Sequence, residues 1–369
     1  MFNSEKKHGD VFRVGYILCY AAVAVLAVVL LFYSAVPHGE KNLVGCVLTG
    51  SRNELGWNSG NYTGLAEACS DHNAELRVRE NVPEEREACL KAIQSLASEG
   101  CRMIFLTSYG YAQYAAEVAG DYPQIKFYAN GSEYTAENMS YCFVRMYQGR
   151  YLSGILAGLT TKTNIIGYVA AMPNNEVNRG INAFALGVRS VNPEAVIRVR
   201  FTGSWDDPVN EKASVELLAS QNADIIAYHQ NEETVPQTCE QLGVDFIGYH
   251  KMSGAYSDHL LTAVTCRWRR MYGIVLQDDL RGRSAFVGDH WLGLNEMTIT
   301  LTKPSARADS GAVAEIMKAK ARIEAGRDVF SDTIYDNNGV LRCGEGEMLS
   351  DAVLLNGMDW FAEGVEIVE

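Results

Sequence analysis

An alternation of short apolar runs and helix-like stretches constrains the fold more than any other feature of this chain. Residues 43–49 form a short apolar run, which predicts a strand buried on both faces of a parallel sheet, and residues 58–72 are predicted to form a helix. Further strands are predicted at 75–79, 102–107 and 124–129, with helices beginning near Pro83 and covering 111–120. Repeated strand-helix-strand units imply parallel strands joined by right-handed crossovers.

The same order then restarts, because the tetrapeptide IGYV at 166–169 repeats the pattern of VGCV at 44–47. The elements predicted after it are helices at 176–190, 232–242 and 308–326, a helix opened by Asp207 as N-cap and Pro208, and strands at 196–201, 223–228, 245–249 and 260–266. A helix at 147–161 is predicted to lead the chain from one half into the other, and the segment 335–346 is predicted to be irregular. The predicted architecture is α/β with two lobes, 41–147 with 265–298 and 148–264 with 299–369.

Residues 14–37 contain no charged side chain, and as a helix these 24 residues would span about 36 Å. Because Lys6, Lys7 and Arg13 precede this stretch, the positive-inside rule predicts a cytoplasmic tail at 1–13, a transmembrane anchor at 14–37 and an extracytoplasmic remainder. The alternative is a cleaved signal, which would release a secreted protein. An uncleaved anchor is favoured because the apolar stretch is long and the nearest candidate cleavage site, at 33–35, begins with a tyrosine.

Charge and cysteine usage exclude several classes of function. The net charge is -13, from 45 acidic and 32 basic residues, and such a surface repels nucleic acids. Of the nine cysteines, Cys19 lies in the apolar stretch, and the others form no CxxC pair, so no metal site and no cofactor is expected. An extracytoplasmic location would permit disulfides, but buried free thiols are predicted for the remaining eight.

Ligands of open α/β sheets bind beyond the carboxyl ends of the strands, so the residues that follow each predicted strand are the candidate site. They combine aromatic side chains, which offer stacking surfaces, with amides and charged groups that can bind a polar edge. A small planar polar ligand such as a purine base suits this mixture. The candidates are Glu54, Trp57, Asn58, Tyr109, Asn130, Gly131, Trp205, Asp206, His229, Gln230, Lys251 and Trp268.

A structural interpretation stands beside the functional one for several candidates. Trp57 can close the base of its helix, and Trp205 can pack as a hydrophobic staple before the helix that follows. Tyr109 and His229 can be core residues, and Lys251 can be an ordinary solvated lysine. The sequence alone leaves both interpretations open for each of these five.

The decapeptide GWNSGNYTGL at 56–65 resembles the first motif of the basic membrane protein (BMP) family of substrate-binding proteins. Further similar segments, in the family's order, are NVPE (81–84), TSYGY (107–111), TTKTNIIGYV (160–169), AFALGVR (183–189), TGSWDDP (202–208), DNNG (336–339) and MDW (358–360). Together they extend the resemblance from about residue 42 to about residue 366. Two departures are that Glu54 stands near the place where nucleoside receptors usually have Asp, and that no lipoprotein cysteine follows the apolar stretch.

The resemblance implies a type I periplasmic binding protein fold whose two lobes close on a ligand without catalysis. It also implies delivery of that ligand to an ABC permease, and a purine base or nucleoside as the ligand, with the GWN and SYGY motifs closer to members that bind adenine-like bases. The expected function is therefore the extracytoplasmic binding component of an ABC importer. The alternatives are a membrane-tethered sensor without transport and, least favoured, a purine-processing enzyme, since no GxSxG, P-loop or GxGxxG motif is present.

Overall fold

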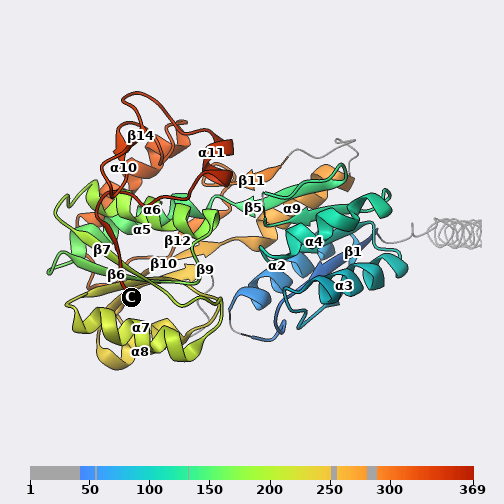
Figure 1. Cartoon of the computed structure of the whole chain (residues 1–369), viewed down its shortest axis with the longest axis horizontal. Helices are drawn as coiled ribbons and strands as arrows, with labels where there is room; N and C mark the ends of the chain where they lie inside the picture. Colours follow the sequence, from blue (N-terminus) through green and yellow to red (C-terminus); the bar gives the residue numbers. More distant parts are fainter. Residues whose placement is uncertain (1–41, 55, 132, 251–255, 281–288) are drawn as a thin grey trace, which may run out of the picture. The chain divides into compact units, whose positions relative to one another are not determined.

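Two β-sheets with helices on both faces organise the chain in the computed structural model (Figure 1). The structure describes residues 42–369 except 55, 132, 251–255 and 281–288, and Asn42–Glu369 forms one unit. Within these described residues no helix has the length and apolar character needed to cross a bilayer. The expected anchor at 14–37 lies outside them.

The first sheet has six strands, all parallel, in the order β11-β5-β4-β3-β1-β2. The strands are β1 Asn42–Val47, β2 Ala74–Arg79, β3 Met103–Leu106, β4 Lys126–Ala129, β5 Met139–Val144 and β11 His290–Leu292. Helices α2 Trp57–Asp71 and α9 Trp268–Leu280 pack on one face, and α3 Arg86–Ser98 and α4 Tyr111–Val118 on the other. We call this sheet with its helices the first lobe.

The apolar run of β3 shows why these strands lack an alternating pattern. Met103 and Phe105 pack with the cluster that contains α2 and α9, whereas Ile104 and Leu106 pack with α3 and α4. Successive side chains of a strand point to opposite faces of its sheet, so a sheet covered by helices on both faces needs apolar residues at every position.

The second sheet has seven strands in the order β12-β10-β9-β8-β6-β7-β15, parallel except for β12 at the edge. The strands are β6 Ile165–Ala170, β7 Val196–Phe201, β8 Ile225–His229, β9 Asp245–His250, β10 Leu260–Cys266, β12 Ile299–Leu301 and β15 Val365–Ile367. In Figure 1, α5 Met146–Thr160 and α6 Asn175–Arg189 lie over one face, and α7 Pro208–Ser220 and α8 Thr234–Leu242 over the other. With α10 Ala312–Glu324, α11 Asp351–Asn356 and the hairpin of β13 Ile334–Tyr335 and β14 Leu341–Cys343, they form the second lobe.

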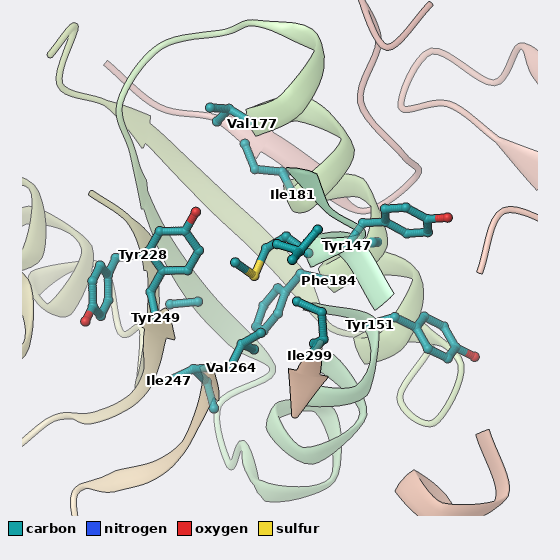
Figure 2. Close-up of a cluster of buried hydrophobic side chains, with 14 of the residues drawn as sticks. Tyr147, Tyr151, Val177, Ile181, Phe184, Tyr228, Ile247, Tyr249, Val264 and Ile299 are labelled. Atoms are coloured by element: carbon teal, nitrogen blue, oxygen red, sulfur yellow. The ribbon is translucent and has the colours of Figure 1, made fainter. Parts of the chain in front are cut away.

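The core of the second lobe joins α5 and α6 to the sheet (Figure 2). Phe184 of α6 is fully buried among side chains that include Ile247 of β9 and Val264 of β10. Glycines let the two helices approach closely, because a Cβ at Gly154 would lie 2.2 Å from the Phe184 carbonyl oxygen and one at Gly187 would lie 2.1 Å from that of Tyr151. This contact packs the middle of α5 against the last turns of α6.

The glycines of the VGCV and IGYV patterns have the same packing role in the two lobes. A Cβ at Gly45 would lie 2.9 Å from Leu96 of α3, and a Cβ at Gly167 would lie 3.1 Å from Leu218 of α7. In both lobes the glycine leaves room for a leucine of a covering helix, which explains why the same local sequence recurs.

Most predicted elements are confirmed, with shifts at their ends. Asp207 is the predicted N-cap, since its carboxylate accepts a hydrogen bond from the Asn210 backbone N–H at 3.0 Å. Four predictions differ from the structure. The helix expected near Pro83 begins at Arg86, and the helix expected at 111–120 ends at Val118 before a 3₁₀ turn. The helix expected at 308–326 covers 312–324, and the segment expected to be irregular contains the β13–β14 hairpin. The eight described cysteines are free thiols, all buried except the partly exposed Cys266.

Candidate functional site

A pocket whose roughly 390 Å³ of empty space includes open solvent lies at the carboxyl ends of the strands of both sheets. We call it the aromatic pocket. Its residues from the first lobe are Trp57, Ser108, Tyr109, Asn130 and Phe143, and those from the second lobe are Glu176, Trp205, His229, Asn231 and Tyr249. A ligand held there touches both lobes at once.

Trp57 is a buried aromatic side chain of the first lobe's wall. It is 8% exposed, and its indole N–H donates to the Thr107 carbonyl oxygen at 2.8 Å. Its ring packs edge-on against His250 and Trp268, with centroids 5.5 and 5.2 Å away. Because its polar atom is already bonded to the backbone, only the ring surface of Trp57 is available to a ligand.

Glu176, His229 and Tyr249 form the polar wall contributed by the second lobe. His229 Nε2 lies 3.3 Å from a Glu176 carboxylate oxygen and 2.7 Å from the Tyr249 hydroxyl. Burial lowers the pKa of His229, so its imidazole is neutral at pH 7. Burial opposes ionisation of Glu176, but His229 and the nearby Arg179 and Arg150 lower its pKa, so the carboxylate is charged. The wall therefore presents a carboxylate acceptor beside a neutral imidazole.

A second cavity, with about 800 Å³ of empty space that includes open solvent, adjoins the aromatic pocket and shares Ser108, Trp205 and Asn231 with it. We call it the acidic vestibule, because Glu54 and Glu84 of the first lobe and Asp206 and Glu232 of the second line it. Burial raises the pKa of Glu54, and the charge of Asp206 raises it further. Burial, followed by Glu54 and Asp206, raises the pKa of Glu232 to about 7. An anionic ligand group would be repelled here.

Glu54 also has a structural role at the start of α2. Its carboxylate accepts hydrogen bonds from the backbone N–H of Asn58 and, at 2.9 Å, from the Asn58 side-chain amide. Asn58 is 3% exposed and also interacts with the Thr49 hydroxyl at 3.2 Å. A carboxylate at a helix N-terminus satisfies free N–H groups and complements the helix dipole.

Glu211, behind the vestibule, provides a test of this electrostatic arrangement. Burial, reinforced by Asp206 and Glu232, raises its pKa from 4.5 to about 7, although one oxygen accepts from the Asp207 N–H at 3.1 Å. The folded state thus retains a proton that the unfolded chain releases, so stability falls as the pH rises from 4.5 to 7 and stays low above 7. We expect Glu211→Gln to raise the free energy of unfolding at pH 8 by about 1–3 kcal/mol, with little change at pH 4.5.

Urea unfolding at both pH values measures this difference. Glu216→Gln, on the exposed side of the same helix, is the matched control and should change neither value by more than about 0.5 kcal/mol. An equal effect of Glu211→Gln at both pH values would contradict the expectation.

The structure brings most of the sequence-predicted site residues to the two cavities. Trp57, Tyr109, Asn130, Trp205 and His229 line the aromatic pocket, and Glu54, Asn58, Asp206 and again Trp205 line the acidic vestibule. Lys251 lies outside the described residues.

Three predicted residues line neither cavity. A Cβ at Gly131 would lie 2.6 Å from that of Ala112, so this glycine allows close packing. Gln230 is fully buried and donates to the Thr202 hydroxyl at 2.8 Å. Trp268 is 5% exposed and supports the ring of Trp57 from α9.

Five residues of the aromatic pocket were not among the candidates: Ser108, Phe143, Glu176, Asn231 and Tyr249. Ser108 and Asn231 stand within two residues of chosen positions, and Tyr249 ends a predicted strand. Phe143 belongs to β5, a strand that was not predicted. Glu176 lies in the first turn of α6, where an acidic residue is common for helix stability and carries no signal of ligand binding.

Comparisons with known proteins extend over both lobes. The sequence model of the Bmp family, described as ABC transporter substrate-binding protein PnrA-like, matches residues 41–326. A purine-binding protein of Brucella abortus (strain 2308) is 32% identical over 340 residues, which cover 89% of this chain and 94% of that protein. A putative ABC transporter glucose-binding protein of Haloferax volcanii is 32% identical over 278 residues, 75% of this chain and 68% of that protein.

Solved structures show the same fold. The structure of an ABC transporter solute-binding protein from Aeropyrum pernix K1 superposes with a TM-score of 0.67 at 16% identity, covering 80% of this chain and 92% of that one. The chain therefore has an α/β fold with two lobes, like that of periplasmic binding proteins.

Proposed function

Because the chain belongs to the Bmp family of PnrA-like ABC transporter substrate-binding proteins, we propose that it binds a purine base or nucleoside in the aromatic pocket and delivers it to an ABC permease. The family consists of substrate-binding proteins, and no catalytic step is part of the proposal. The main support for this proposal is the aromatic pocket, where rings from both lobes surround a few polar groups.

The composition of the pocket favours a flat heteroaromatic ligand. Trp57 and Tyr109 from the first lobe and Trp205 from the second provide ring surfaces for stacking. The Glu176 carboxylate can accept an N–H of the base, while Asn130 and Asn231 can both donate and accept. Such a combination of stacking and edge recognition is what a purine requires.

The acidic vestibule supports a base or nucleoside over a nucleotide. Its carboxylates can accept hydrogen bonds from ribose hydroxyls, but they repel a phosphate group. Closure of the lobes would follow binding, because only the closed form contacts the ligand from both sides.

We also propose that residues 14–37 hold the receptor at the outer face of the membrane, close to its permease. The support is the uncharged stretch itself and the basic residues before it. If this segment is an uncleaved anchor, the mature protein retains residues 14–37 and stays in the membrane fraction after a high-salt wash. A mature N-terminus near residue 36 would contradict the anchor and indicate a cleaved signal.

A thermal-shift panel on the purified protein tests the ligand. It should contain adenine, guanine, hypoxanthine, their nucleosides and nucleotides, and glucose. A ligand at 100 times its dissociation constant adds about 2.7 kcal/mol to the free energy of unfolding. Stabilisation by a base or nucleoside is the expected result, whereas stabilisation by glucose alone would keep the fold and overturn the purine proposal.

Trp205→Ala is expected to weaken binding of the purine identified in this panel by about 1–3 kcal/mol, roughly 5- to 150-fold, because a stacking surface is lost. Trp205 is only partly buried, so the unfolding free energy should change much less than at a core tryptophan. Isothermal titration calorimetry measures the affinity, with Tyr335→Ala, an exposed aromatic outside both cavities, as the control. Unchanged affinity of Trp205→Ala would reject stacking on this ring.

A further inference from the structure

Arg150 is a fully buried arginine beneath the aromatic pocket that the proposed function does not use. It lies on α5 with 0% exposure, and its Nη2 donates to the Tyr228 carbonyl oxygen at 2.7 Å. Among the described residues, its Nε and Nη1 have no hydrogen-bond partner and no carboxylate lies within 4 Å of it. A buried charge with so few partners is costly, which suggests a role other than stability.

Arg150 contacts Tyr249, which belongs to the polar wall of the pocket. Its guanidinium carbon lies 4.1 Å from the ring centroid of Tyr249, whose hydroxyl is 2.7 Å from His229 Nε2. The same nitrogen of His229 lies 3.3 Å from the Glu176 carboxylate. The positive charge of Arg150 is thus one tyrosine ring away from a histidine–carboxylate pair.

Several other titratable or charged groups lie around the His229–Glu176 pair. They are Arg179 of α6, Tyr168 of β6, Cys266 of β10, and Tyr109 and Tyr141 of the first lobe. Arg179 is the second cation and also lowers the pKa of Glu176, and it donates to the Leu354 carbonyl oxygen and lies 4.9 Å over the Trp291 ring, contacts that join α6 to its neighbours. The tyrosines and the cysteine are uncharged at neutral pH because burial raises their pKa values.

We propose that Arg150 is a positioning residue whose buried positive charge acts together with burial to hold His229 uncharged beside the Glu176 carboxylate throughout the physiological pH range. A histidine beside a carboxylate normally gains a proton readily, because the resulting cation is paired. Burial is the main cause of the lowered pKa of His229, and the charge of Arg150, one tyrosine ring away, opposes the proton further. The Glu176 carboxylate then remains an acceptor for the ligand, and the imidazole keeps one donor and one acceptor nitrogen.

This inference rests on the proposed function only for its consequence in binding. If His229 took up a proton, its imidazolium would pair with Glu176, and the carboxylate would have less capacity to accept an N–H from a base. Ligand affinity would then fall as the pH decreases. With Arg150 in place, the His229–Glu176 pair should add no loss of affinity between pH 8 and pH 5, whereas Glu232 of the vestibule titrates near pH 7 with or without Arg150.

The protonation of His229 can be measured without any ligand. Nitrogen-15 NMR of histidine-labelled protein, with the His229 signals assigned by His229→Gln, should show a neutral imidazole from pH 8 down to pH 5 in the wild type. In Arg150→Met the midpoint should rise by at least one pH unit, whereas Arg150→Lys should retain the wild-type behaviour. Adding Glu176→Gln to Arg150→Met removes the anionic partner and should lower the midpoint again.

Two results would overturn the proposal. One is a wild-type His229 that titrates near 6.5, the ordinary value for histidine. The other is an Arg150→Met protein whose His229 titrates as in the wild type. If Arg150→Met does not fold, Arg150→Gln replaces it in the same titration, because glutamine can still donate a hydrogen bond but carries no charge.

Adenine binding is the functional readout and separates this proposal from the proposed function. On going from pH 8 to pH 5, Arg150→Met should lose at least tenfold more affinity for adenine than the wild type does, because any effect of Glu232 is common to both proteins. The same pH dependence of affinity in Arg150→Met and the wild type would overturn the inference alone. If the wild type binds no purine at any pH, the proposed function fails, and the histidine titration still tests Arg150.

Discussion

Gly56→Ala is expected to weaken ligand binding roughly 100-fold while the unliganded protein stays folded. Gly56 of the first lobe faces the backbone of Asn231 in the second, and a Cβ placed on it would lie 2.0 Å from the Asn231 carbonyl oxygen. No flexible side chain can move away here, because the contact is with backbone. Overpacking of this kind costs about 1–3 kcal/mol, and the upper end corresponds to the stated loss.

The effect should appear in binding because the clash exists only where the lobes meet. Asn231 lines both cavities, so an alanine at 56 would hold the lobes apart at the ligand itself. A protein whose closed form is less populated binds its ligand more weakly by the same factor. Small-angle X-ray scattering with saturating ligand should show a larger radius of gyration for Gly56→Ala than for the wild type.

Gly120→Ala is the matched control, since nothing lies within 4 Å of a Cβ at that position. It should bind as the wild type does. Wild-type affinity in Gly56→Ala would mean that ligand binding does not require the contact between Gly56 and Asn231.

The fold was largely predictable because the apolar runs that indicate its strands are local features of the sequence. A sheet buried on both faces needs continuous apolar strands, and β1, β3 and β6 each supply one. The repetition of Gly45 at Gly167 then indicated a second lobe, and the structure shows that both glycines accommodate a leucine of a covering helix. β11 could not be foreseen, because three residues are too few to form a pattern, and its place in the first sheet depends on pairing with the distant β5.

The candidate site was predictable where a residue lies between a strand and the first turn of the helix that follows it. Trp57, Tyr109 and Trp205 were found this way, and all three line the aromatic pocket. Glu176 and Arg150 were missed because their importance comes from tertiary contacts: each lies within a helix, and only the packing of α5 and α6 against the sheet brings them to His229. Charge networks of this kind have no spacing rule in the sequence.

Trp57→Ala is expected to lower the free energy of unfolding by about 3–5 kcal/mol, the cost of removing a buried tryptophan. The ring is 8% exposed and packs against Phe143, His250 and Trp268, so its loss leaves a cavity between the first sheet and α9. The same change removes the donor to the Thr107 carbonyl oxygen. Urea unfolding without ligand measures the effect.

Trp57→Phe separates the two roles of this side chain. Phenylalanine keeps a ring in the pocket but cannot donate to Thr107, so it should cost about 1–3 kcal/mol of stability for a buried acceptor left unpaired. Ligand affinity should then fall much less in Trp57→Phe than in Trp57→Ala, because a stacking surface remains. Trp205→Ala, with near wild-type stability and weakened binding, is the counterpart from the second lobe. Equal loss of affinity in Trp57→Phe and Trp57→Ala would contradict a stacking role for Trp57 and leave it as a core residue that only shapes the wall.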